Sequence, residues 1–368
     1  MHDLAIASST KPRSGSSVRA NLALLLFSVG LSLAVLELLA RVMLPAPLPW
    51  LYPQLGYRPD PNTIFAFIPN QKGFTADKPV SINERGFRGA VLPYERTPGV
   101  LRVMFLGDSI AFGYGVNDAE VVSERVRELL HKDGVALETI NTAVPAYNML
   151  QEINYLDADG VRYQPDWVIV GVCWNDIGDK SDVRVDSQGR LTTVTAAPEP
   201  ATAVATESEI GYALRNVLKR SRFMYGALEG WRALTDLREP DPQTTFRMEV
   251  LEGRDTQRIV DGWNDVANQL HRLRALADTH GFKPLLVAFP IPLAIEQPFP
   301  KSSYPARLQE LAGHEGIPVI DLDPAFQSAF HGHESLFIPY DGDHPNAAGH
   351  AIAAHEIHAF LAAHVKGG

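Results

Sequence analysis

The chain has 368 residues, of which 45% are hydrophobic and 21% are charged, and 33 Lys and Arg against 43 Asp and Glu give a formal net charge of −10. This hydrophobic content excludes an intrinsically disordered chain, and a single cysteine excludes an internal disulfide or a cysteine-based zinc finger. The acidic balance argues against a protein that binds nucleic acid over its whole surface. The length fits one large domain with extensions, or two domains.

A long apolar segment lies near the N-terminus. No charge occurs between Ala20 and Leu36, and Glu37 and Arg41 are the only charges before Leu44. A membrane-spanning helix needs about 20 residues, so we expect a transmembrane signal-anchor helix at 20–44, ended by the prolines that follow. Basic residues precede it, so the positive-inside rule makes 1–19 a cytoplasmic tail and places the rest outside, in the periplasm or extracellular space. The alternatives are a cleaved signal peptide and a buried soluble helix.

The rest of the chain predicts an α/β domain. Residues 45–99 are rich in Pro, Asn and Gly and indicate an extracytoplasmic lead-in with short strands, in which the turn at 83–88 buries Phe87. Short apolar runs then predict strands at Arg102–Leu106, Leu137–Asn141, Trp167–Cys173, Pro284–Phe289 and Pro318–Leu322. Apolar spacing of three to four predicts helices at Glu120–His131, Met149–Asp159, Asp255–His280, Tyr304–Leu311 and Asn346–Val365. This alternation predicts a three-layer, flavodoxin-like fold with a five-stranded parallel sheet over residues 100–366.

One interval interrupts the alternation. Residues 178–253 carry a Thr-, Ala- and Pro-rich run, Leu191–Thr206, followed by an aromatic-bearing stretch with Tyr212, Phe223, Tyr225 and Trp231. Long loops of this kind are usually functional or disordered. We expect an insertion over the sheet edge that contributes to the substrate cleft and is partly flexible.

Reactive side chains follow the predicted strands, where open parallel sheets bind ligands. Ser109 follows the first strand, Asn175 follows the third, and Asp341 and His344 precede the last helix. A serine needs a base within hydrogen-bond reach, and the base needs an orienting group. We expect Ser109, His344 and Asp341 to form such a set, with one loop supplying both the base and the acid.

A tetrahedral intermediate also needs donors for its oxyanion, each contributing about 3 to 4 kcal/mol in other enzymes. The candidates are the backbone N–H of Ser109, the side-chain amide of Asn175 and the backbone N–H of Ala146. The single cysteine, Cys173, follows the apolar run Val168–Val172 and is expected to be a buried thiol.

These blocks have a family pattern. Gly107-Asp108-Ser109, then Asn175-Asp176, then Asp341-x-x-His344, in this order on a βαβ alternation, resemble the SGNH (GDSL-like) hydrolases, which are serine esterases and acylesterases. The resemblance covers residues 101 to about 365. It implies that Ser109 is the nucleophile, Asn175 an oxyanion donor, His344 the base and Asp341 its partner.

The second block departs from the family pattern. Glycine usually supplies an oxyanion N–H there, whereas Ala143 and Ala146 occupy the candidate positions in this chain. An alanine keeps the N–H, but its Cβ is costly if the loop requires a positive φ.

Metal binding and dinucleotide binding have weaker support in the sequence. Six residues between 331 and 350 suit zinc by type, namely His331, His333, Asp341, Asp343, His344 and His350. They include no helical i,i+4 histidine pair, so we predict no metal, and His350 is expected to be a packed or exposed helix residue. Gly113-Tyr114-Gly115 lacks the third glycine of a dinucleotide-binding loop, and no Gly-Lys-Ser/Thr occurs, so we predict no cofactor.

The sequence therefore predicts a membrane-anchored, outward-facing serine esterase. We expect it to hydrolyse an O-acyl ester, such as an O-acetyl ester, on a small molecule or on an envelope or extracellular polysaccharide, with Tyr114 and Trp174 contacting the substrate. No nucleic-acid partner is expected. One alternative is an O-acyltransferase using the same serine, and another is a catalytically silent, membrane-tethered carbohydrate-binding protein.

Overall fold

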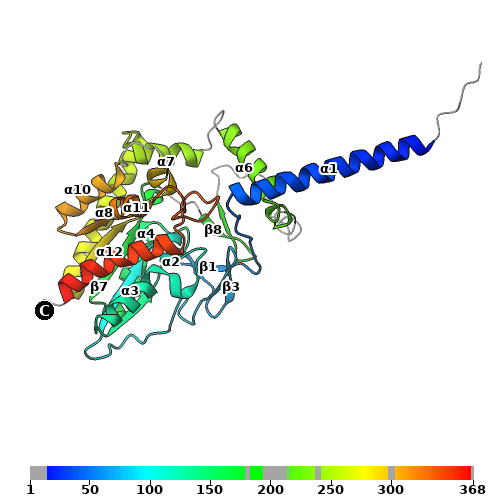
Figure 1. Ribbon diagram of the computed structural model, residues 1–368. Helices are drawn as coiled ribbons and strands as arrows, with labels where there is room; N and C mark the ends of the chain where they lie inside the picture. Colours follow the sequence, from blue (N-terminus) through cyan, green and yellow to red (C-terminus); the bar gives the residue numbers. More distant parts are fainter. Residues whose placement is uncertain are drawn as a thin grey trace, which may run out of the picture.

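The computed structural model describes residues 15–178, 183–193, 214, 216–236, 242–296 and 303–365. Its first element, helix α1 (Gly15–Met43), projects away from an α/β body (Figure 1). The apolar span Val18–Met43 has a mean hydropathy of 2.4, and none of its most apolar part is buried in the protein. An exposed helix of this length and composition suits a membrane anchor or a signal sequence, and it is not the core helix of a soluble domain.

A five-stranded parallel sheet forms the centre of the body, as the sequence predicts. Its strand order is β11-β10-β7-β5-β6. The strands are β5 (Leu101–Leu106), β6 (Leu137–Asn141), β7 (Trp167–Val172), β10 (Lys283–Ala288) and β11 (Val319–Asp321). After β6 the chain crosses β5 to add β7, so the strand order reverses beside β5. That reversal leaves a crevice at the carboxyl end of β5, where ligands bind in open α/β sheets.

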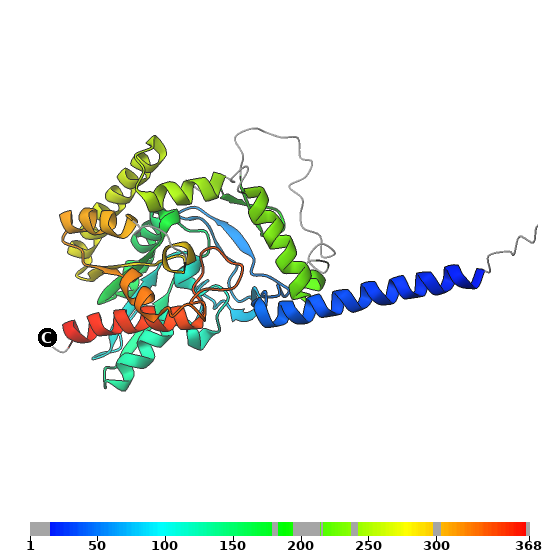
Figure 2. The ribbon, with the colours of Figure 1, turned by 45° about the horizontal axis from the view of Figure 1, so that its top comes forward.

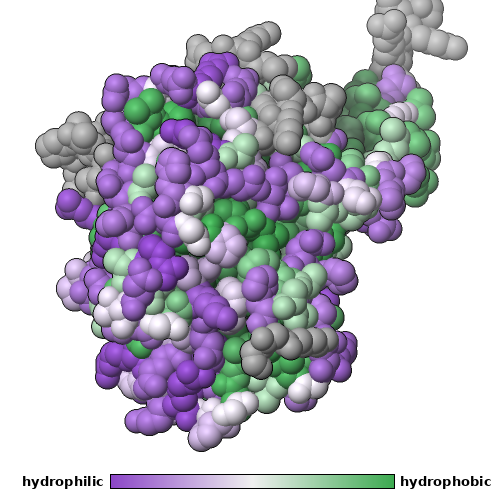
Figure 3. Space-filling view, turned by 90° about the vertical axis from the view of Figure 1, so that its left-hand side faces the viewer, coloured by the Kyte–Doolittle hydropathy of each residue, from purple (hydrophilic) through white to green (hydrophobic). Residues whose placement is uncertain are grey.

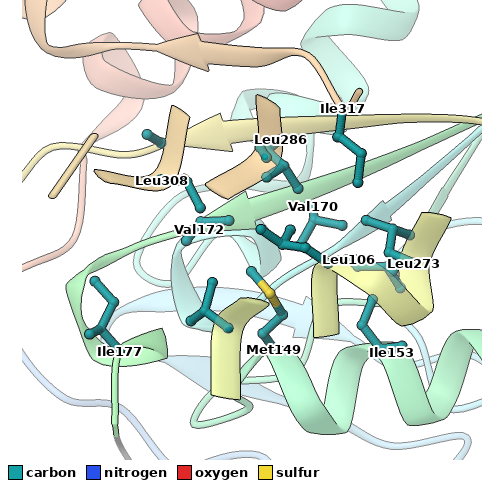
Figure 4. Packing of buried hydrophobic residues seen from close by; sticks show 14 of the residues in the cluster. Leu106, Met149, Ile153, Val170, Val172, Ile177, Leu273, Leu286, Leu308 and Ile317 are labelled. Atoms are coloured by element: carbon teal, nitrogen blue, oxygen red, sulfur yellow. The ribbon is translucent and has the colours of Figure 1, made fainter. Parts of the chain in front are cut away.

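Helices cover both faces of the sheet. Met104 and Leu106 of β5 pack in one cluster with α4 (Met149–Ala158), α8 (Gln257–His280) and α10 (Tyr304–His314), part of which Figure 4 shows. Val103 and Phe105 point to the other face, toward α3 (Val122–Lys132), α11 (Asp323–Ala329) and α12 (Ala347–Val365). Side chains that alternate between two buried faces explain why the strands are continuous apolar runs in the sequence.

The lead-in and the insertion add elements outside the sheet. Two antiparallel hairpins lie in the lead-in, β1 (Tyr57–Asp60) with β2 (Ile64–Phe67) and β3 (Lys72–Thr75) with β4 (Lys78–Ser81). The insertion contributes the hairpin β8 (Val183–Val185) and β9 (Leu191–Thr193), then α6 (Arg222–Asp236) and α7 (Pro242–Glu252). Residues 194–206 of the Thr-, Ala- and Pro-rich run, and Tyr212, lie outside the described residues.

Short helices occupy the loops at the strand ends. They are α2 (Ser109–Phe112), η1 (Asp118–Glu120), η2 (Gly160–Tyr163), η3 (Trp174–Asp176) and α9 (Pro292–Ile295). The face of the body opposite α1 is mainly hydrophilic, with hydrophobic residues in separate patches (Figure 3). The residues that carry chemistry lie on α2, on η3 and in the loop before α12.

Candidate active site

Ser109 is placed by a tight turn after β5. Gly107 has φ 147°, and a Cβ on it would lie 2.5 Å from the Cβ of Ala111, so only glycine fits. Asp108 caps α2 by accepting a hydrogen bond from the Ile110 N–H at 2.8 Å, and it is 2% exposed. Ser109 is the first residue of α2 and stays partly exposed beyond the end of the sheet.

Ser109, His344 and Asp341 form a continuous chain of contacts. His344 Nε2 lies 2.8 Å from Ser109 Oγ, and His344 Nδ1 lies 2.8 Å from Asp341 Oδ1. Asp341 Oδ1 also accepts the backbone N–H groups of Asp343 and His344, each at 2.9 Å. The Tyr114 ring lies 4.7 Å from the imidazole, centroid to centroid. One short loop therefore holds the acid and the base in hydrogen-bond geometry, as the three-residue spacing predicts.

The surroundings of His344 favour its charged form. Burial by itself would lower the pKa of His344, but the hydrogen bond to Asp341 and the negative charges of Asp341, Asp343 and Asp108 raise it above its ordinary value. Burial would raise the pKa of Asp341, but its bonds to His344 and the Asp343 N–H hold it below its ordinary value. The site thus stabilises an imidazolium next to a carboxylate, which is the state that forms when the imidazole accepts a proton from serine.

A second carboxylate is held behind the histidine. The Trp174 indole Nε1–H donates to Asp343 Oδ1 at 2.9 Å, and Arg247 on α7 lies 3.6 Å from Asp343 Oδ2. The Arg247 guanidinium also stacks over the Trp174 ring, 4.9 Å from its centroid. Burial raises the pKa of Asp343, and the Arg247 charge opposes this rise. Because Arg247 lies about 100 residues away from Asp343 in the chain, sequence spacing gave no signal for this contact.

The three predicted oxyanion donors have different surroundings. The Ser109 N–H is at the first position of α2, where a helix offers no intrahelical acceptor. Asn175 Nδ2 donates to Asp108 Oδ2 at 2.9 Å, which uses one of its two hydrogens. Ala146 is exposed with φ 67°, and among the described residues its N–H donates to no protein acceptor. The loop does adopt the positive φ that makes alanine costly there.

Arg88 fixes the loop after the nucleophile, a role that the sequence did not reveal. Its guanidinium donates to the carbonyl oxygens of Phe112, Gly113 and Val116 at 2.6 to 3.1 Å and to Asp118 at 2.8 Å. The Arg88 side chain is 3% exposed. In the sequence its charge indicated a surface turn, and only the buried carbonyl groups of a distant loop explain why it is inside. The preceding Phe87 is partly buried against Tyr155.

A cavity of about 300 Å³ opens beside the Ser-His-Asp set. Its wall includes Leu48, Trp50, Tyr114, Tyr225, Tyr340 and Asp341. Tyr114 lines this cavity, and its contact with substrate remains a prediction. Trp174 does not line this cavity and is 7% exposed, so substrate contact by Trp174 remains a prediction while its observed contacts are with Asp343 and Arg247.

The sequence also singled out a set of possible metal ligands, His350 and Cys173, and the Sγ of Cys173 contacts Asn175 Oδ1 and lies 3.4 Å from Asp108 Oδ2. In the part of the chain that the structure describes, no three His, Cys, Asp or Glu side chains are grouped as metal ligands. His350 is fully buried, and burial lowers its pKa to about 3, so it is a packed neutral residue. Cys173 is a buried free thiol, as expected.

A parallel α/β sheet with serine, histidine and aspartate in contact beyond its carboxyl edge is typical of serine hydrolases. The family model for the GDSL-like Lipase/Acylhydrolase family matches residues 105–352, and the chain belongs to this family. It is accordingly an ester-hydrolysing enzyme.

Comparison with solved structures finds several esterases of low sequence identity. A lipase from a goat rumen metagenome is 14% identical with a TM-score of 0.42, covering 71% of this chain and 97% of that one. A lipase/acylhydrolase from Enterococcus faecalis is 15% identical with a TM-score of 0.40, covering 71% and 95%. A two-domain esterase active on acetylated mannans is 15% identical with a TM-score of 0.40, covering 71% of this chain and 49% of that one. A search among curated proteins found no match.

Proposed function

We propose that this enzyme is a membrane-anchored serine esterase whose nucleophile is Ser109. The observation that carries the proposal is the chain of two 2.8 Å contacts from Ser109 Oγ through the His344 imidazole to Asp341. These distances lie within the range required for proton transfer from a nucleophile to its base and for orientation of that base.

The contacts support a two-step reaction. His344 Nε2 accepts the Ser109 proton while Oγ attacks the ester carbonyl carbon, and Asp341 stabilises the resulting imidazolium. The oxyanion then accepts hydrogen bonds from the N–H groups of Ser109 and Ala146 and from the Asn175 amide. The intermediate collapses as His344 protonates the leaving alcohol, leaving an acyl group on Ser109. A water molecule deprotonated by His344 releases this group as a carboxylic acid.

The proposed substrate is an O-acyl ester, such as an O-acetyl ester, of an envelope or extracellular polysaccharide. Tyr114 supplies an aromatic wall beside His344 on which a sugar ring can stack. The proposed domain arrangement is a cytoplasmic tail at 1–19, an anchor at 20–44, a lead-in at 45–99 and the hydrolase domain at 100–366. The insertion at about 178–253 supports this arrangement by contributing Tyr225 to the cavity wall.

The test is hydrolysis of p-nitrophenyl acetate by the full chain in detergent. We expect Ser109→Ala and His344→Ala each to lower kcat by about 10³-fold or more. Ser335→Ala and His331→Ala serve as matched controls, since both residues lie away from the cavity wall, and they should keep wild-type rates. Equal rates in wild type and Ser109→Ala would overturn the proposal.

A second assay distinguishes hydrolysis of the acyl group from its transfer to a saccharide. Acetylated polysaccharide should release acetate, and added unacylated saccharide should not divert the acyl group from water. Transfer to the saccharide in place of hydrolysis would instead identify an O-acyltransferase that uses the same Ser109 intermediate.

A further inference from the structure

Helix α6 carries an exposed apolar face. Met224, Trp231 and Leu234 are 51%, 67% and 61% exposed. Their spacing of seven and three residues places them within about one quarter of the helix circumference. Val217, shortly before the helix, is also 56% exposed. We call these four residues the α6 apolar face.

Contacts with α1 fix the beginning of α6. Glu37 on α1 accepts hydrogen bonds from Ser221 Oγ at 2.7 Å and from the Phe223 N–H at 3.1 Å. Arg222 donates to the carbonyl oxygens of Arg41 and Leu44 at 2.7 and 2.9 Å. The N-terminal end of α6 is therefore attached to the last turns of the apolar helix α1.

Close packing completes the junction. A Cβ on Gly226 would lie 2.5 Å from Leu44 Cδ1, so the absence of a side chain at Gly226 lets α6 approach the end of α1. Both ribbon views show α6 crossing the end of α1 instead of running alongside it (Figures 1 and 2). If α1 follows the membrane normal, α6 lies at a steep angle to that normal, close to the membrane surface. Its position along the normal is where α1 leaves the hydrocarbon core.

The composition around this face matches a phospholipid surface. An exposed tryptophan is enriched where helices meet the membrane interface, and basic residues attract anionic head groups. Arg220 and Arg222 are basic residues directly before and at the start of α6, Lys219 donates to the Leu48 carbonyl oxygen at 2.7 Å, and Arg232 pairs with Glu229 at 2.8 Å. The start of α6 is attached to the last turns of α1, and this attachment identifies the occupant of the apolar face as the bilayer that α1 enters.

We propose that the α6 apolar face lies in the interfacial layer of this bilayer, as a second membrane contact of the protein. The proposal rests on the anchoring by α1 that is part of the proposed function, and it is independent of the roles proposed for Ser109 and His344. Tyr225 and Leu228 of α6 line the cavity beside the Ser-His-Asp set, and Leu228, four residues after Met224, borders the α6 apolar face. Membrane contact would therefore hold one wall of the cavity at the lipid surface and favour ester substrates located there.

The test uses single cysteines labelled with an environment-sensitive fluorophore in the full chain. Cys173 is buried, so the added cysteines are the accessible ones among the described residues. Met224→Cys and Leu234→Cys report on the α6 apolar face. Leu150→Cys on α4 is the matched control because Leu150 is 46% exposed, and Leu31→Cys reports on α1. Each variant is reconstituted into phosphatidylethanolamine and phosphatidylglycerol vesicles, with a nitroxide-bearing lipid as quencher.

We expect the Met224→Cys and Leu234→Cys labels to be quenched at least about twofold more than the Leu150→Cys label by lipids with a nitroxide near the head group. The Leu31→Cys label should respond best to a nitroxide deep in the acyl chain. Quenching at Leu31 without quenching at positions 224 and 234 would overturn the interfacial helix while leaving the anchor intact. Absence of quenching at all of them would overturn both. Retained p-nitrophenyl acetate hydrolysis shows that each labelled variant is folded.

Discussion

Ala146→Gly should stabilise the enzyme. Ala146 has φ 67°, a left-handed conformation that costs an L-residue about 1 to 2 kcal/mol and costs glycine nothing comparable. Glycine also gives the unfolded chain more conformational freedom, which lowers the stability of the folded protein by about 0.4 to 1 kcal/mol. Because Ala146 is exposed, loss of its methyl group forfeits no burial. The expected net change is a gain of about 0.5 to 1 kcal/mol in the free energy of unfolding.

The assay is urea unfolding of the full chain in detergent, followed by tryptophan fluorescence. Ala143→Gly is the matched control, since Ala143 lies in the same loop but is buried and has no positive φ. It should lose about 1 kcal/mol. Turnover by Ala146→Gly should stay near the wild-type rate because the backbone N–H is kept. A loss of stability in Ala146→Gly equal to that in Ala143→Gly would refute the conformational argument.

Three further predictions concern the site and its supports. Activity requires neutral His344, and the pKa of His344 is raised, so kcat/KM of the wild type should rise with pH through a value above 6.5. Asp341→Asn removes the neighbouring negative charge, so it should move this rise to lower pH and lower the plateau by up to about 10⁴-fold. Measured pH–rate profiles of the two proteins check both effects. Because the pKa of His344 is raised in the folded protein, protonated His344 stabilises the fold at pH values below its ordinary pKa, and this stabilisation is lost as pH rises through the raised pKa. The urea midpoints of wild type and His344→Ala should therefore converge at high pH. A difference between the two midpoints that stays constant with pH would contradict this prediction. Gly107→Ala should cost about 1 to 3 kcal/mol, because its Cβ would meet Ala111, and an unchanged urea midpoint would contradict the close approach.

The sheet could be predicted from the sequence because its inner strands β5, β7 and β10 are buried on both faces. The prediction of Leu137–Asn141 has both boundaries correct, and the other predicted strands differ from the observed ones by one residue at one or both ends. The helices that pack on the sheet, such as α8, carry long apolar repeats and were also found. The short helix α2 and the insertion helices α6 and α7 were not placed, since their positions depend on contacts with distant segments.

At the active site, too, residues with a local sequence pattern could be predicted, and residues that depend on distant segments could not. The order of the Gly-Asp-Ser, Asn-Asp and Asp-x-x-His blocks predicted which residues meet, and the structure brings Ser109, His344 and Asp341 into contact. Arg88 and Arg247 were missed because a charged side chain in a single sequence indicates exposure. Their partners come from segments that only the fold brings near.

The most direct test of the central claim is the site of covalent labelling by a fluorophosphonate, which reacts with activated serines. Tandem mass spectrometry of the labelled full chain should place one adduct on Ser109, with residual p-nitrophenyl acetate hydrolysis falling in proportion to the labelled fraction. His344→Ala should prevent labelling, because the serine then lacks its base. An adduct on another serine, or hydrolysis that persists when Ser109 is fully labelled, would contradict the account.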